Sequence, residues 1–259
     1  MTSKLNRFSP SMINTYINCP ILFYYRYIAK IHLKQKQIHL LFGGAIHKAV
    51  ECIYDKIDPF QPFIQHFQKE KLLDEEKDQH EEFLKLGHEM IRNYIETHKT
   101  ISKLYDLDSG KSELYVRRYL KNPLTDEISS LPMSGIIDRL TSDGKIVEYK
   151  TSKNKWKQDD VNYKIQTLLY NLWYYSENNI LPTETIYIIL LKKYKYQGRG
   201  ETYQVLSNHY TLEDLANTFE EIELILQKIN NGEFERPSGY HPSYCDCYKY
   251  EKELSINKS

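Results

Sequence analysis

The chain has 259 residues, of which 41% are hydrophobic and 27% are charged, a composition typical of a globular protein with a substantial core. Its 35 basic and 35 acidic residues leave a formal net charge of zero, so overall charge supplies no argument for a polyanionic partner. No run approaches the ~20 apolar residues that cross a membrane, and the N-terminus has no apolar signal region, so we expect no membrane partner and a cytoplasmic location, whether nucleoid-associated or virus-encoded.

The first predicted element is a broken helix. Ser9 can cap the first helical turn, and Pro10 fits the first helical position because its missing N–H is not needed there. Apolar residues then follow at helical spacing as far as Pro20, which interrupts the pattern before it resumes in FYYRYI.

Two more helices are expected before the first strand. One follows Gly43 and Gly44 and carries His47 beside an apolar stripe. The other covers 81–98, where apolar residues recur with the helical period. The charged stretch 69–82 is predicted to be exposed.

Further along the chain, the pattern changes to strands with one interposed helix. The predicted elements are a strand at 112–120, a hairpin at 135–150, a helix at 159–178, a strand at 186–193, a turn at 198–200, a strand at 202–208 and a helix at 211–230 that is capped by Thr211 and ends near Gly232.

We found no linker, internal repeat or low-complexity segment, so we predict one domain over 1–259. Within it, 1–100 is the mainly helical part, 110–210 is the sheet core that contains the hairpin, and 211–259 holds the C-terminal helix and a cysteine-containing tail.

The hairpin carries the clearest chemical signal. Asp143 and Gly144 mark a turn that closes a three-residue loop, since glycine can adopt the left-handed conformation required there. Counting outward from the loop puts Asp138 directly opposite Glu148, and the alternation of side chains puts Lys150 on the same face.

Two carboxylates opposite one another on paired strands repel unless a cation lies between them. The alternative is a solvent-facing hairpin whose charges are simply hydrated. Apolar neighbours on both strands favour a buried hairpin instead, and buried charge is costly without a partner. The pattern therefore predicts a metal site at Asp138 and Glu148.

Two basic runs, 145–157 and 191–199, flank the hairpin chemistry. A run of lysines usually forms a solvated face. Because aromatic residues are interleaved with them, Trp156 could instead stack on a base while Lys153 follows the phosphates of a nucleic acid.

Several motifs taken together resemble the PD-(D/E)XK nuclease superfamily, and within it the RecB-like branch that includes the CRISPR adaptation exonucleases. In chain order the matching residues are Ser9, Ser11, Tyr16, Cys19 and Pro20 with the following FYYRYI; GGAIH at 43–47; GIIDR with VEYKT; and Gln166 with Tyr170 in a Q-x-x-x-Y pattern. The resemblance implies an α/β fold with a restriction-endonuclease-like core, a central mixed sheet flanked by helices, and an N-terminal helical region.

The resemblance also implies roles for the residues of the hairpin. Asp138 and Glu148 would hold Mg²⁺ or Mn²⁺, with the Tyr149 backbone carbonyl as another ligand, because hard cations prefer oxygen ligands. His47 would complete the ligand set from its helix. Lys150 would orient the attacking water or stabilise the charge that develops on the phosphate.

Gln166 and Tyr170 stand four residues apart, so they share one helix face. The resemblance implies that they position the nucleic-acid strand, and the alternative is an ordinary helix face. Glu113, on the preceding strand, is a minor candidate for the same cleft.

The cysteines depart from the pattern of that branch. Many of its members hold an iron-sulfur cluster with one N-terminal and three C-terminal cysteines, whereas only Cys245 and Cys247 follow Cys19 in the matching positions here. A cluster, or a zinc site from Cys19, His241, Cys245 and Cys247, is a weak prediction because neither spacing is standard. The favoured interpretation is a metal-free tail packed against the first helix, with Cys52 as a separate buried cysteine.

These observations predict a metal-dependent deoxyribonuclease, an exonuclease or flap-trimming enzyme acting on single-stranded ends in DNA repair or recombination. The chain has no Walker A motif, so it would rely on a separate helicase or recombination protein, or on ends that are already exposed. The alternatives are an inactive DNA-binding or scaffold protein that keeps the fold, and a nuclease that acts on RNA.

Overall fold

The computed structural model describes residues 5–33, 37–192, 201–236 and 245–256. The predicted turn at 198–200 and His241 lie outside these residues. No helix among the residues that are described is long and apolar enough to cross a membrane.

The N-terminal helix begins and breaks where the sequence predicts. Helix α1 spans Pro10–Asn18, and the Ser9 hydroxyl accepts a hydrogen bond from the Met12 N–H at 3.3 Å. Helix α2, Pro20–Phe23, follows directly and runs into a π-helical turn, η1, at Tyr24–Ile28. Pro20 therefore divides the helix without ending the helical region.

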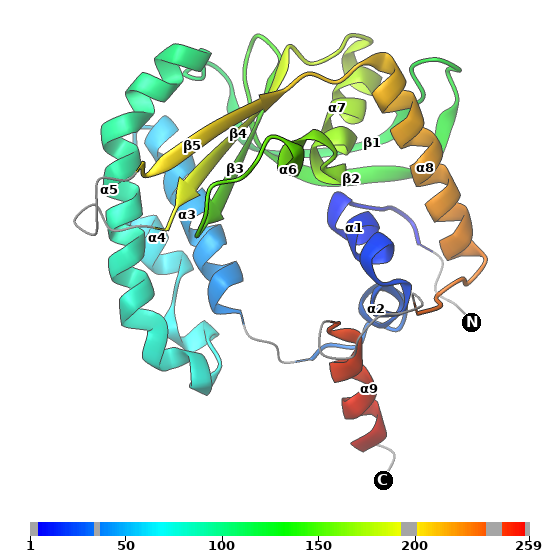
Figure 1. Ribbon diagram of the computed structural model, residues 1–259, viewed down its shortest axis with the longest axis horizontal. Coiled ribbons are helices and arrows are strands. Elements are labelled where there is room, and N and C mark those ends of the chain that lie inside the picture. The colour runs from blue at the N-terminus through cyan, green and yellow to red at the C-terminus, as the bar shows by residue number, and fades with distance from the viewer. Residues whose placement is uncertain (1–4, 34–36, 193–200, 237–244, 257–259) are drawn as a thin grey trace.

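The next helices form a group of their own on one side of the molecule (Figure 1). They are α3 at Ile38–Tyr54, α4 at Phe60–His66, two 3₁₀ turns at Lys69–Lys71 and Asp74–Gln79, and α5 at His80–Tyr105. Helix α3 begins five residues before Gly43, so both glycines lie inside the helix and not before it.

The charged stretch 69–82 is not uniformly exposed, which corrects the prediction. Glu76 is only 1% exposed. Its carboxylate accepts hydrogen bonds from the backbone N–H groups of Gln37 at 2.9 Å and Ile38 at 3.0 Å. A helix begins with N–H groups that lack partners within the helix and favour a nearby negative charge, so this buried glutamate caps α3.

The central sheet has five strands in the order β1-β2-β3-β4-β5. They span Lys111–Lys121, Ile128–Leu140, Lys145–Ser152, Glu184–Leu191 and Tyr203–Asn208. All neighbouring strands are antiparallel except β3 and β4, which are parallel because helices connect them across one face of the sheet.

The connection between β3 and β4 contains two helices where one was predicted. Helix α6 spans Asp159–Asn162 and helix α7 spans Ile165–Asn178. The chain leaves the helical conformation at Lys164, whose φ of −71° and ψ of 113° are extended. A hydrogen bond from the Tyr210 hydroxyl to the Val161 carbonyl at 3.2 Å holds the end of α6.

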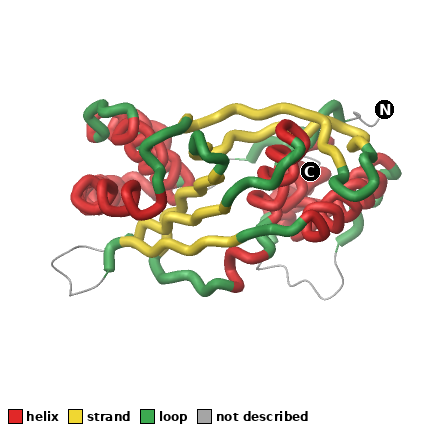
Figure 2. The backbone as a smooth tube through the Cα atoms, turned by 90° about the horizontal axis from the view of Figure 1, so that it is seen from above, coloured by secondary structure: helices red, strands yellow, loops and turns green. Residues whose placement is uncertain are grey.

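Two hydrophobic cores lie on opposite faces of the sheet. Ile146 of β3 packs into the core shared with α1, α7 and α8, while its neighbour Val147 packs into the core shared with α3, α4 and α5. Helix α8, Leu212–Asn230, begins at the predicted cap Thr211. Seen from above, helices gather at both ends of the sheet (Figure 2).

The fold class predicted from the sequence is confirmed: a mixed sheet flanked by helices, with helices at the N-terminus. Within the described part of the chain, strand β3 contributes buried side chains to both cores. Side chains on its two faces therefore meet helices from both halves of the molecule.

Candidate active site

The hairpin between β2 and β3 has the register that the sequence predicts. Arg139 lies opposite Val147, so the next position outward sets Asp138 opposite Glu148. Gly144 closes the loop with a φ of +87°, in the left-handed region that glycine reaches without strain.

Asp138 ties β2 to β3 and to helix α3. One of its carboxylate oxygens, Oδ2, accepts a hydrogen bond from the Tyr149 N–H at 2.8 Å. The other, Oδ1, lies 3.4 Å from Nδ1 of His47. Burial by itself would lower the pKa of His47, but the hydrogen bond and the charge of Asp138 raise that pKa above its usual value.

Glu148 is almost fully buried, with 1% of its surface exposed. Lys150 donates a hydrogen bond to its Oε1, whereas its Oε2 has no hydrogen-bond partner within the described part of the chain. Burial, and then the charge of Asp138, raises the pKa of Glu148 to about 7. The carboxyl therefore favours its ionised form less than an exposed glutamate does, unless a positive charge compensates.

Lys150 lies on the same face as Glu148, as predicted. Burial opposes its positive charge, but the carboxylate of Glu148 outweighs this and raises the pKa of Lys150. Its ammonium group also donates to Oε1 of Gln166 at 3.1 Å. The lysine is held between a strand neighbour and helix α7, which fixes its position.

Glu113 was only a minor candidate in the sequence, and the structure brings it to the same place. One ligand atom from each of His47, Glu113 and Asp138 lies within 4.8 Å of the others. Partial burial and the charge of Asp138 raise the pKa of Glu113. Its local sequence carries no signal for this position.

The residues present fit a hard divalent cation. Carboxylate oxygens together with one imidazole nitrogen are donors that Mg²⁺ and Mn²⁺ accept. The buried Oε2 of Glu148 needs a partner that the described residues do not supply. Tyr149 is buried with its ring against Tyr54 and Tyr94. A ligand role for its carbonyl stays a prediction.

A groove of roughly 1190 Å³ opens beside Lys150, and the predicted nucleic-acid residues Gln166, Tyr170 and Trp156 line it. Tyr170 is 3% exposed, and its hydroxyl donates to the Ile136 carbonyl at 2.7 Å, so it also holds α7 against β2.

The aromatic and basic side chains around the groove differ in their contacts and in their exposure to solvent. The Lys164 ammonium lies 5.1 Å from the centre of the Trp156 ring. Tyr163 is 82% exposed at the groove, and sequence reasoning did not single it out. Lys153 is exposed on the loop that follows β3.

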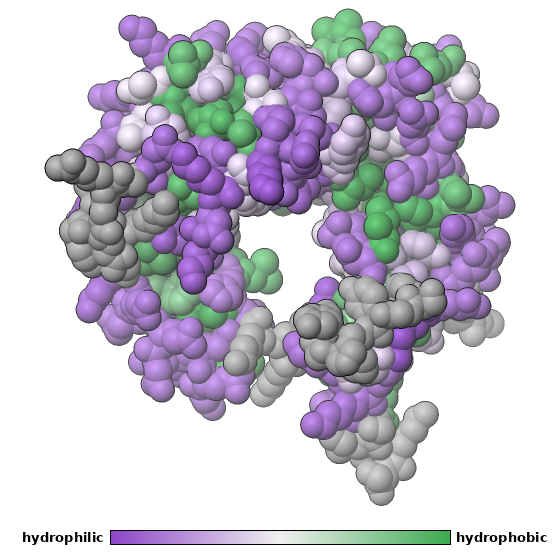
Figure 3. All heavy atoms as spheres, viewed as in Figure 1, coloured by the Kyte–Doolittle hydropathy of each residue, from purple (hydrophilic) through white to green (hydrophobic). Residues whose placement is uncertain are grey.

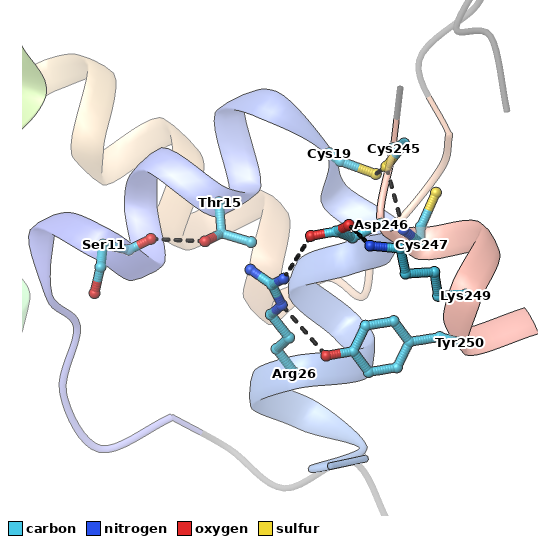
Figure 4. A network of polar contacts seen from close by, with 9 residues as sticks. All are labelled: Ser11, Thr15, Cys19, Arg26, Cys245, Asp246, Cys247, Lys249 and Tyr250. Carbon is cyan, nitrogen blue, oxygen red and sulfur yellow. Dashed lines mark hydrogen bonds and ion pairs between the residues drawn. The ribbon is translucent and has the colours of Figure 1, made fainter. Parts of the chain in front are cut away.

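The three cysteines of the less favoured cluster and zinc alternatives lie close together (Figure 4). Sγ atoms of Cys19, Cys245 and Cys247 all lie within 4.8 Å of one another, and the first two are 3.2 Å apart. Burial raises the pKa of Cys19, which favours neutral thiols packed together. Cys52 is buried separately on α3, as expected.

The C-terminal tail is held by helix packing and polar contacts in addition to the packed cysteines. Helix α9, Cys247–Ile256, lies against α2 and η1. Arg26 contacts Asp246 at 3.1 Å and donates to the Tyr250 hydroxyl at 3.3 Å (Figure 4). The tail is therefore packed against the first helices, as expected, and whether its cysteines bind a metal stays a prediction.

Comparisons with known proteins agree with this fold. A family model described as the PD-(D/E)XK nuclease superfamily matches residues 7–249. The solved structure of a candidate exonuclease from Eubacterium rectale is similar with a TM-score of 0.55 and 13% identity, covering 95% of this chain and 88% of that chain. At this identity the likeness concerns the fold alone.

A second solved structure, that of SSO0001, has a TM-score of 0.30 and 10% identity, and the similarity covers 77% of this chain and 81% of that chain. This likeness is too low to carry an argument. No curated protein matches the sequence at a significant level.

Proposed function

We propose a function from one premise, that this chain belongs to the PD-(D/E)XK nuclease superfamily. We propose that it is a divalent-metal-dependent nuclease that hydrolyses DNA phosphodiester bonds, as an exonuclease or flap-trimming enzyme on single-stranded ends. The observation that carries the proposal is the joint placement of Asp138, Glu148 and Lys150 on one face, with an unsatisfied buried oxygen on Glu148 among the described residues.

Asp138, Glu148 and His47 would hold Mg²⁺ or Mn²⁺. When bound, such a cation makes a water molecule more acidic and stabilises negative charge on the phosphate. The burial of Glu148 and Asp138 keeps bulk water from screening these charges.

Lys150 would act on the phosphate as negative charge develops. Its ammonium group is fixed by Glu148 and Gln166, so it needs little reorganisation during the reaction. Hydrolysis adds a water oxygen to phosphorus, breaks the bond to the leaving oxygen, and returns a proton to that oxygen. Lys150 is positioned to orient the water or to stabilise this charge.

The surroundings of this site favour single-stranded ends as the substrate. Figure 3 shows an open space through the middle of the molecule, beneath the sheet and between the side of α3 and the side of α1. The groove beside Lys150 carries exposed Tyr163 and the Trp156 and Lys164 pair, which suit base stacking and phosphate contact. Duplex DNA would need to be opened first, by a separate helicase or recombination protein in repair or recombination.

The test uses end-labelled single-stranded DNA, duplex DNA and single-stranded RNA, each with Mg²⁺ or Mn²⁺. We expect the wild type to degrade single-stranded DNA, and Glu148→Ala and Lys150→Ala to lose at least about a hundredfold in rate, because each removes a group that acts on the developing charge. Glu127→Ala, which removes an exposed carboxylate on another face, serves as the matched control. Circular dichroism checks that every variant is folded.

The alternatives give different outcomes in the same assay. Binding without cleavage by the wild type and both site variants would identify a scaffold protein. Cleavage of the RNA alone would identify a ribonuclease. Products shortened only from a labelled end would identify an exonuclease, whereas internal cuts would contradict it.

A further inference from the structure

Strand β1 has one buried face and one open face. Val116 and Leu120 are buried in the core shared with α1, α7 and α8. The backbone of Glu113 is left-handed, with a φ of +48°, so the regular alternation of side chains begins after it. From there to Tyr119 the pairing of β1 with β2 is continuous. The residues that alternation places on the open face are Tyr115, Arg117 and Tyr119.

The open face of β1 is a row of two aromatic rings with a cation between them. Tyr115 is 57% exposed and Tyr119 is 52% exposed. Alternate residues of a strand stand about 7 Å apart, so about 13 Å separates the two tyrosines, with Arg117 midway. Ile136 of β2 is also exposed, and it lies opposite Tyr115 and widens the apolar surface. Exposed apolar groups gathered in this way mark a binding surface.

The arginine in this row is not held by an acidic residue. Its neighbour Arg118, on the other face of the strand, contacts Glu177 of α7 at 2.6 Å. Arg117 is exposed and has no such ion pair within the described part of the chain. An exposed guanidinium group without an acidic partner is available to bind a phosphate.

A second arginine reaches the same place from the N-terminal segment. Ser134 of β2 stands opposite Arg117, and its hydroxyl accepts a hydrogen bond from Arg7 at 3.2 Å. The backbone fixes this approach, because the Phe8 N–H donates to the Pro132 carbonyl at 3.1 Å and the Ser134 N–H donates to the Phe8 carbonyl at 2.8 Å. Two guanidinium groups beside one serine repel each other, and a phosphate between them would offset this repulsion.

The row on β1 is continuous with the groove of the candidate active site. The residues that line this groove include Lys150, Arg7, Ile136 and Tyr115. Its acidic lining residues, Asp214 and Glu221, both belong to α8, so the lining residues from β1, β2 and the N-terminal segment are basic, aromatic, apolar or neutral. A strand that leaves the groove over β1 therefore passes Tyr115 first, and then Arg117 and Tyr119.

We propose that the open face of β1 is a binding platform for single-stranded DNA. Bases stack on Tyr115 and Tyr119, while Arg117 and Arg7 hold phosphates. An aromatic face accepts any base and the arginines contact only the backbone, so binding is independent of sequence. The bases of an intact duplex are stacked on one another and do not fit this platform. This inference rests on the proposed function, because it describes how the strand is held outside the active site.

The test measures the binding of a fluorescein-labelled thymidine oligonucleotide to the full chain by fluorescence anisotropy, in EDTA, so that a metal-dependent enzyme does not cut it. Tyr115→Thr and Tyr119→Thr remove the rings, and threonine suits an exposed strand. Tyr119→Phe keeps the ring and is the matched control. Arg117→Ala is compared with Arg118→Ala, which removes an exposed arginine from the other face.

We expect each threonine variant to bind the single strand at least about fivefold more weakly than the wild type, which is the effect of losing one stacked base. Their affinity for duplex DNA should not change. Arg117→Ala should reduce the slope of log affinity against log salt concentration by about 0.7, the contribution of one phosphate on a single strand. Tyr119→Phe should bind no more weakly than the wild type, and Arg118→Ala should keep the wild-type slope.

Wild-type affinity for the single strand in both threonine variants would overturn the inference, and so would an equal change of slope in the two arginine variants. Circular dichroism checks folding, and the arginine pair decides if a threonine variant is unfolded.

A nuclease assay with Mg²⁺ on the same proteins separates the two proposals. Binding that depends on the rings, in a protein that cuts nothing, would contradict the proposed nuclease and leave the platform intact. Cutting by a protein whose variants all keep the wild-type affinity would overturn the platform alone.

Discussion

At the scale of single residues, Asp138 combines two tasks. Its Oδ2 accepts the Tyr149 N–H in place of a backbone carbonyl, and its Oδ1 faces His47. Because one oxygen holds the strands together, alanine at this position would remove a structural contact as well as a charge. Asparagine keeps an oxygen and loses the charge, so it separates the two tasks.

The charge of Asp138 should be required for stabilisation of the protein by a metal. We expect saturating Mn²⁺, at about a hundred times its dissociation constant, to stabilise the wild type by roughly 2.7 kcal/mol. For a chain of this size that corresponds to a rise of about 5 °C or more in melting temperature. Asp138→Asn should show little rise. Differential scanning fluorimetry in EDTA and in Mn²⁺ checks both, and an equal rise in the variant would contradict the assignment.

Gly135 shows how tightly Tyr170 packs. A methyl group at Gly135 would lie 2.8 Å from the Tyr170 ring, and that ring cannot move freely because its hydroxyl is bonded to the Ile136 carbonyl. We expect Gly135→Ala to lower the free energy of unfolding by about 1–3 kcal/mol, the usual effect of overpacking.

Urea denaturation measures the effect of this substitution. The control is Gly43→Ala, where the nearest atom would be 3.8 Å away and a helical alanine is favoured. A Gly135→Ala protein as stable as the wild type would show that Tyr170 is free to shift.

At the scale of elements, the sequence predicted those features that depend on interactions between residues close together in the chain. The turn at Gly144 and the alternation along each strand fixed the register of Asp138 and Glu148, because both act within a few residues. The cap at Ser9 was predicted for the same reason.

Features that depend on distant contacts could not be predicted. Glu76 looks like any charged residue in sequence, yet it is buried because α3 brings N–H groups to it. The break at Lys164 coincides with the Tyr210 contact to the end of α6, which comes from a segment after β5. The turned backbone of Glu113 has no sequence signal, since glutamate is not a residue that favours it.

Glu76 provides a test of this long-range cap. We expect Glu76→Ala to destabilise the protein by about 1–3 kcal/mol, since it leaves buried N–H groups without an acceptor. Hydrogen exchange should accelerate in the first turn of α3, and urea denaturation measures the loss. The exposed neighbour Glu75 is the control position, and Glu75→Ala should leave exchange in α3 unchanged.

At the scale of the whole molecule, helix α2 and the turn η1 are packed against the C-terminal helix α9 at a distance from the sheet (Figure 1). Tyr250 is 3% exposed and stacks on Tyr25 with ring centres 5.4 Å apart. This contact joins α9 to η1 and belongs to a small core of its own. The stability of this small core should therefore not affect metal binding at the hairpin.

Tyr250→Ala tests that separation. We expect α9 to exchange its amide hydrogens much faster, because the loss of a buried aromatic ring removes about 3–5 kcal/mol of packing. Mn²⁺ affinity should stay at the wild-type value. Lys249→Ala, at an exposed position one residue earlier, should leave α9 protected. A parallel loss of Mn²⁺ binding in Tyr250→Ala would show that the tail supports the metal site.

The position of strand β3 between the two hydrophobic cores affects how the candidate active site is assembled. His47 arrives on a helix of one core and contacts Asp138 of β2, whereas Gln166 arrives on a helix of the other core and contacts Lys150 of β3. Both groups of helices must therefore pack against the sheet before the proposed active site is complete. We expect a chain in which only one of the two cores has formed to be inactive.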